Sequence, residues 1–105
     1  MSDIAIIGSG IAGLFSALKL ANAGHEVTVI TKQRLKDSST NWAQGGIAGI
    51  LDKTDIGAKE SHIEDTLKSG DGLCNESMVR EVIEGAAECI FELVNIGVQF
   101  EKNQQ

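Results

Sequence analysis

Residues 4–13 read IAIIGSGIAG, an apolar run that ends in three glycines with the spacing GxGxxG. The apolar run is typical of a buried parallel strand. A second run, rich in β-branched residues, covers residues 27–30, and Gly24 lies where a left-handed residue would end an intervening helix. The apolar residues of that helix recur at helical spacing, at Ile11, Leu14, Phe15, Leu18 and Ala21. The sequence therefore predicts an α/β fold with a βαβ unit over residues 3–32.

The three glycines have different tasks in a turn from strand to helix. Gly8 permits the tight turn, Gly10 lets the backbone approach a diphosphate, and Gly13 lets the helix pack against the strand. The backbone amides at the start of the helix would then face the anion. An ordinary strand-to-helix turn does not need glycine at all three spacings. We therefore predict a Rossmann-like dinucleotide site whose diphosphate-binding turn consists of Gly8, Ser9, Gly10, Ile11, Ala12 and Gly13.

The end of the second predicted strand lacks an expected acid. In NAD-binding units an Asp or Glu, about 20 residues after the glycines, bonds the ribose hydroxyls. Thr31 and Lys32 stand there instead, which makes NAD less favoured. Lys32 and Arg34 could pair with the 2′-phosphate of NADP, so NADP stays open as an alternative from residue chemistry alone.

Composition limits the remaining classes of function. The 105 residues suffice for one compact unit, and nine basic against fifteen acidic residues disfavour nucleic acid and anionic membranes. No apolar run reaches the roughly 18 residues of a membrane span, and no basic start precedes an apolar stretch, so we expect a cytoplasmic protein. Cys74 and Cys89 lack partners at ligand spacing, so no metal site is predicted and both are expected to be buried free thiols.

Two further helices are expected at about residues 58–69 and 76–96. The second has a continuous apolar stripe, with Asn75 available as its N-cap and Gly97 as its terminator. The first is more polar, because Ile63 and Leu67 are its only large apolar residues. We therefore expect the first helix to lie on a surface.

A resemblance to a known family depends on residues 38–48, which read SSTNWAQGGIA. This hydroxyl-rich turn leads into paired glycines, which a nicotinamide-binding domain does not require. Together with residues 30–32 (ITK), it resembles the flavoprotein family of L-aspartate oxidase and the flavin subunits of succinate dehydrogenase and fumarate reductase. Residues 62–67 (HIEDTL), 70–74 (GDGLC) and 97–100 (GVQF) extend the resemblance over nearly the whole chain.

The resemblance implies that FAD is the cofactor and that residues 1–105 form the N-terminal part of a discontinuous FAD-binding domain, which a capping domain interrupts. In this family a Thr-Lys or Ser-Lys pair replaces the ribose-binding acid. The pair at Thr31 and Lys32 therefore fits an FAD site, and the resemblance favours FAD over NADP. Ser9 to Ala12 would lie along the diphosphate, with Thr31 and Lys32 toward the adenosine. A loop over residues 38–50 would follow FAD toward its flavin ring. Its cofactor-binding residues would be Ser39, Thr40, Asn41, Trp42, Ala43, Gln44, Gly45 and Gly46.

The resemblance also implies an activity for the complete enzyme. L-aspartate would be oxidised to iminoaspartate, which would pass to quinolinate synthase for NAD biosynthesis. FAD would be held without a covalent bond, because Ser39 occupies the position of the histidine that links flavin in succinate dehydrogenases. A dehydrogenase or reductase subunit, acting on another small dicarboxylate, and a non-catalytic dinucleotide-binding module remain alternatives.

No residue of this chain is predicted to be catalytic. Histidine often serves as an acid–base catalyst, and Asp65 lies one helical turn from His62, but such a pair on a polar helix is interpreted as a surface contact. Trp42 could pack against flavin or fill a core. The 105-residue chain alone is therefore expected to be inactive, because the remaining segments of the FAD domain and the capping domain would be missing.

Overall fold

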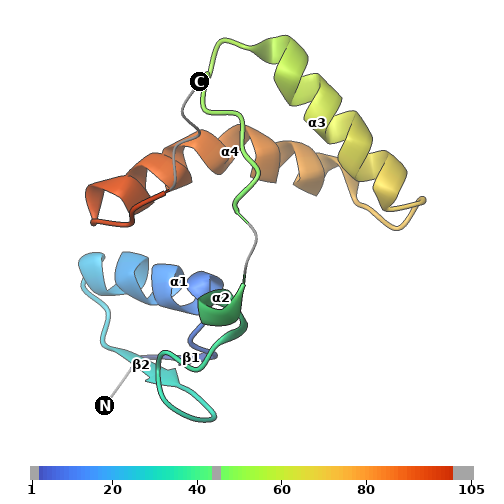
Figure 1. The fold of residues 1–105 in the computed structure, drawn as a ribbon. Helices are drawn as coiled ribbons and strands as arrows, with labels where there is room; N and C mark the ends of the chain where they lie inside the picture. Colours follow the sequence, from blue (N-terminus) through green and yellow to red (C-terminus); the bar gives the residue numbers. More distant parts are fainter. Residues whose placement is uncertain (1–2, 44–45, 101–105) are drawn as a thin grey trace. The chain divides into compact units, whose positions relative to one another are not determined.

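A computed structural model describes residues 3–43 and 46–100 (Figure 1). The chain divides into two compact units, the first ending at Gly46 and the second beginning at Ile47. Each unit has its own secondary structure and its own internal contacts.

The first unit contains a parallel pair of strands joined by a helix. Strand β1 (Ile4–Ile7) pairs with β2 (Val27–Ile30) in a register that sets Ile4 beside Val27 and Ile7 beside Ile30. Helix α1 (Ile11–Asn22) connects the two strands and contacts both. A short helix, α2 (Ser39–Trp42), follows. The chain thus has the mixed α/β architecture that the sequence predicts.

The prediction that both strands are buried is wrong. Along each strand, half-buried and exposed residues alternate, and Ile7 is 87% exposed. The physical reason is that α1 packs on the pair of strands, and successive side chains of a strand point to opposite faces. Within the described residues of this unit, only the side chains turned toward α1 gain partial cover.

The second unit is a pair of packed helices. Helix α3 (Ile56–Ser69) begins at Asp55, whose carboxylate accepts from the Ala58 amide at 2.9 Å. Helix α4 (Glu76–Asn95) begins at Asn75, whose side chain accepts from the Met78 amide at 3.2 Å. These caps satisfy amides that have no partner inside a helix. Asn75 is thus the N-cap that the sequence predicts.

Ile63 is the side chain of α3 that is buried in the core of this unit. It is 1% exposed and packs with α4, whose buried residues are Ile83, Ala87 and Leu93. Helix α3 lies on the surface of the unit, as expected, because Ile63 is the one buried residue of this helix. Cys89 is also exposed, not buried as expected. It follows Ala87 by two positions, which is about 200° around a helix.

Glycines end two of the helices. Gly24 follows α1 with φ +93°, and Gly97 follows α4 with φ +105°. Both values lie in the left-handed region that glycine adopts without strain. In the part of the chain that the structure describes, no helix combines the length and the apolar character needed to cross a membrane.

Candidate functional site

The glycine-rich turn joins the end of β1 to the start of α1. Gly8 has φ +112°, and its amide donates to the Ile30 carbonyl at 2.8 Å. A Cβ atom on Gly13 would collide with the carbonyl oxygen of Gly8 and lie 3.4 Å from Ile6 Cγ2. Gly8 is therefore needed for its backbone conformation, and Gly13 for the close approach of helix to strand. These are the tasks that the GxGxxG spacing predicts for the two residues.

The first turn of α1 has a cap from a distant residue. Gly10 is the N-cap and offers no side chain, but the Thr40 hydroxyl accepts from the Ile11 amide at 3.0 Å. A Cβ atom on Gly10 would lie 3.3 Å from that hydroxyl oxygen, a tight contact. Among the described residues, the amides of Ala12 and Gly13 have no acceptor. Two amides of the helix N-terminus thus remain open to an anion.

Ser9 and Thr31 are brought together across the ends of the two strands. Their hydroxyl oxygens lie 3.1 Å apart, and Ser9 is only 5% exposed. Lys32, the next residue along the chain, is exposed. The position that carries an acid in NAD-binding units therefore holds a hydroxyl that is already bonded within the turn.

The segment from Ser38 to Trp42 meets the turn through Thr40. The Ser38 hydroxyl accepts from the Asn41 amide at 3.4 Å and starts α2. Trp42 is 73% exposed, so it fills no core within this unit. Ser39, Asn41, Ala43 and Gly46 are also exposed. Of the predicted flavin-side residues, Gln44 and Gly45 lie outside the described residues.

The role of Thr40 as a helix cap is not evident from the motif alone. The sequence predicts that Thr40 is one of the residues that lead toward the flavin ring. In the structure, the Thr40 hydroxyl lies at the start of α1. One signal was available, because an N-cap glycine leaves the first amides of a helix without a side-chain acceptor. A hydroxyl from elsewhere in the chain can accept from such an amide, and residues 38–40 offer three hydroxyls.

Shifted pKa values occur in the second unit. Hydrogen bonds from Thr54, first from its side chain and then from its backbone, hold the pKa of the Asp52 carboxyl below its ordinary value. Hydrogen bonds to Glu60 and then Glu76 raise the pKa of the Arg80 guanidinium, which lies 2.8 Å from Glu60. Both groups are exposed and serve a turn and a surface ion pair, so neither indicates catalysis.

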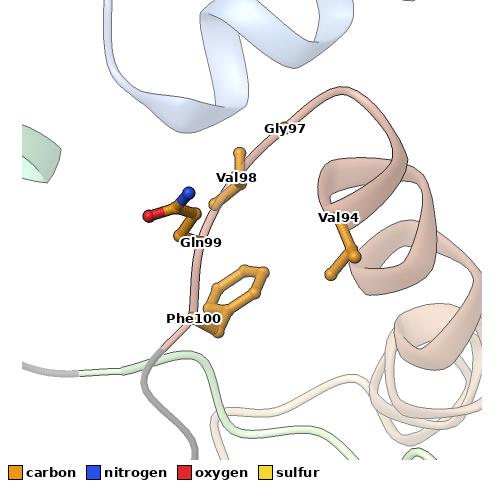
Figure 2. A pocket seen from close by; sticks show the side chains of 5 residues that line it. All are labelled: Val94, Gly97, Val98, Gln99 and Phe100. Carbon is orange, nitrogen blue, oxygen red and sulfur yellow. The ribbon is translucent and has the colours of Figure 1, made fainter.

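A hollow lies where the chain leaves the C-terminal end of α4. Figure 2 shows Val94 on α4 and the Phe100 ring facing it from the segment that follows, which also carries Val98 and Gln99. The lining of the hollow is completed by Gly97 and contains no charged group. A site for a small polar substrate needs a few convergent polar groups to orient it. We therefore do not assign the hollow a catalytic role.

Comparison with known proteins defines the class of protein. The family model of the FAD-binding domain matches residues 3–105, so this chain belongs to the FAD-binding-domain family. Its cofactor is FAD. The prediction of FAD is confirmed.

The curated relatives narrow the class to one kind of enzyme. L-aspartate oxidase from Pseudomonas aeruginosa is 47% identical over 104 residues, which cover 98% of this chain and 19% of the relative. The L-aspartate oxidase of Vibrio cholerae is 44% identical over 97% of this chain and 18% of its own length. That of Streptomyces coelicolor is 39% identical over 99% and 18%. The chain thus spans slightly under one fifth of the length of these relatives, and the resemblance to their family is confirmed.

Proposed function

We propose that this chain forms the diphosphate-binding part of the flavin site in an L-aspartate oxidase, which converts L-aspartate to iminoaspartate. The observation that supports this most directly is the turn from Gly8 to Gly13. It combines a backbone that only glycine allows with two helix amides that have no acceptor among the described residues. The relatives that match nearly the whole chain are named as L-aspartate oxidases.

The residues of the turn fit the diphosphate of FAD. The Ala12 and Gly13 amides would donate to phosphate oxygens, helped by the positive end of the α1 dipole. Gly10 leaves room for those oxygens, since a Cβ atom there would already press on Thr40. The Thr40 hydroxyl accepts from Ile11 and so keeps its own proton available for a phosphate oxygen. The same turn therefore supplies amides, space and one hydroxyl donor.

The proposed fold is a Rossmann-like βαβ unit over residues 3–32, within a discontinuous FAD-binding domain of which residues 1–105 are one part. The parallel register of β1 and β2, the helix between them and the turn at their carboxyl ends support it. Lys32, exposed just after β2, would lie toward the adenosine. The loop over residues 38–50 would lead toward the flavin ring, with Ser39, Asn41, Trp42, Ala43, Gln44, Gly45 and Gly46 along FAD.

Bound FAD supplies a hydride acceptor for the α-carbon of the amino acid. This chain would contribute binding and orientation, because none of its residues is proposed as the base or as a carboxylate clamp. A dicarboxylate substrate calls for arginines that bind its two carboxylates, and Arg34 and Arg80 are the only arginines of the sequence. Arg80 is already engaged by Glu60 and Glu76. We therefore expect the 105-residue chain alone to lack activity.

The partners and the place in metabolism belong to the same proposal. L-aspartate or another small dicarboxylate would be the substrate, and iminoaspartate would be consumed by quinolinate synthase on the way to NAD. The remaining segments of the FAD domain and a capping domain would complete the site. A cytoplasmic location belongs to the same proposal.

The test is anaerobic reduction of the flavin in the complete protein. L-aspartate should bleach the flavin absorbance, and succinate at the same concentration should leave it unchanged. Bleaching by succinate but not by L-aspartate would replace the proposal with the dehydrogenase alternative. A flavin that neither compound reduces would favour the non-catalytic module.

The mode of flavin attachment is a second test of the same choice. Ser39 is exposed and has a hydroxyl of high pKa with no base beside it in the described segment, so it is a poor nucleophile toward the flavin ring. We expect acid precipitation of the complete protein to release the yellow colour to the supernatant. Colour retained in the pellet would contradict non-covalent binding.

A further inference from the structure

We propose that Thr31 is a positioning residue of the flavin site, whose hydroxyl holds Ser9 and thereby the diphosphate turn, and that it supports FAD binding through this contact. The proposal rests on the proposed function, since it concerns how the same site is built. Its starting point is the 3.1 Å distance between the Ser9 and Thr31 hydroxyl oxygens, 22 residues apart in the chain.

The bond continues the pairing of the two strands into the turn. The ladder ends at Ile7 beside Ile30, and the next link is the bond from the Gly8 amide to the Ile30 carbonyl. The contact between Ser9 and Thr31 comes one residue further along each segment. The turn is therefore attached to the end of β2 by a backbone bond and then by a side-chain bond. Beyond it, the backbone of Gly10 leads directly into the amides of α1.

Burial explains why this bond matters for Ser9. Ser9 is 5% exposed, and within the described part of the chain no buried side-chain nitrogen or oxygen lacks a partner. Thr31 is the partner that Ser9 has in the structure. If the Thr31 side chain rotated away from Ser9, the Ser9 hydroxyl would lose that partner in a place that water hardly reaches. A buried hydroxyl without a partner is costly, so this rotation is disfavoured.

This assignment changes how the adenosine end is recognised. In NAD-binding units, the residue at the end of the second strand reads the ribose hydroxyls directly. Here that position is used to build the turn. The next residue along the chain, Lys32, is exposed and has no hydrogen bond to the turn among the described residues. Replacing Thr31 should therefore affect FAD through the diphosphate turn and not through the ribose.

The experiment is a double-mutant cycle in the complete protein. FAD affinity is measured by titrating the deflavinated wild type, Thr31→Val, Ser9→Ala, the double variant and Thr31→Ser. Thr31→Val keeps the branched shape without the hydroxyl, and we expect it and Ser9→Ala each to weaken FAD binding about three- to tenfold. The double variant should bind FAD no more weakly than the single variant with the larger loss of affinity, because both changes remove one shared interaction. Thr31→Ser restores the hydroxyl and should bind within about twofold of the wild type.

An FAD analogue whose adenosine lacks the ribose hydroxyls separates positioning from direct contact. If Thr31 acts through Ser9, Thr31→Val weakens FAD and the analogue by the same factor. Losses that add in the double variant, or a Thr31→Val effect that disappears with the analogue, would overturn the inference. Circular dichroism of each apo-protein confirms that affinities refer to folded protein, and Ser9→Ala with Thr31→Ser keeps the test decisive if Thr31→Val unfolds. A wild type that binds no FAD would instead reject the proposed function itself.

Discussion

The two units of this chain are built in different ways. In the first, no residue of α1 is buried, Ile7 and Ile30 are exposed, and the well-defined features are a glycine turn and two hydroxyl contacts. In the second, α3 and α4 enclose a small apolar core and start at side-chain caps. The first unit is thus organised around backbone groups that can receive a ligand, and the second around its own packing. Changes in the first should affect FAD, and changes in the second should affect stability.

The largest effect is expected at Gly10, where the comparison predicts a loss of cofactor. In Gly10→Val the side chain would enter the space of the phosphate oxygens and press on the Thr40 hydroxyl. We expect FAD affinity of the complete protein to fall by about a hundredfold or more, or about 2.8 kcal/mol. Absorbance of the purified variant and titration with FAD measure this. A variant that stays yellow with ordinary affinity would show that the diphosphate lies elsewhere.

Ile63 provides the corresponding test of the second unit. Ile63→Ala truncates the largest fully buried side chain of the core, which typically costs about 2–5 kcal/mol of the free energy of unfolding. Urea denaturation of the complete protein, or hydrogen exchange over α3 and α4, measures the loss. The matched control is Ile56→Ala on the same helix, where the side chain is 71% exposed and the expected cost is below about 0.5 kcal/mol. Equal losses at the two positions would contradict the assigned core.

Gly85 sharpens the contrast between glycines that are required and glycines that are not. It lies inside α4, and a Cβ atom there would meet no atom within 4 Å. Because alanine favours a helix interior, Gly85→Ala should stabilise the protein by about 0.5–1 kcal/mol and leave FAD affinity unchanged. Thermal unfolding and FAD titration measure the two properties. Loss of FAD in this variant would contradict the view that the first unit binds FAD and the second contributes only stability.

The smallest effect is a pH dependence at Asp52, before α3. Its pKa is lowered in the folded chain by bonds from Thr54, so the unfolded chain binds its proton more readily. The resulting stabilisation is complete above the ordinary Asp pKa of about 4 and is lost as the pH falls through the lower folded pKa. In Thr54→Val the Asp52 pKa should move upward toward its ordinary value. NMR titration of the carboxyl carbon checks this, and an unmoved pKa would exclude the Thr54 side chain as its cause.

Short sequence patterns predicted most of the helices and strands. The apolar run before Gly8 and the β-branched run over residues 27–30 predicted both strands, and Asn75 with Gly97 predicted the ends of α4. These signals are local because caps and glycine conformations depend on a few neighbouring residues. The burial of the two strands and of Cys89 was predicted less well, because burial depends on which other element covers each face.

The sequence by itself determined the glycine turn, its place between a strand and a helix, and the cofactor class. The turn and its place follow from the backbone freedom of Gly8 and from the close packing that Gly13 permits, both encoded by the spacing of the glycines. The cofactor class follows from the family resemblance that residues 38–48 carry. Only the tertiary structure decided that Thr40 caps α1 and that Thr31 holds Ser9. Both contacts join residues more than 20 positions apart, and no local pattern reports which hydroxyl meets which group. They depend on the parallel register of β1 and β2 and on the course of the chain back to the turn.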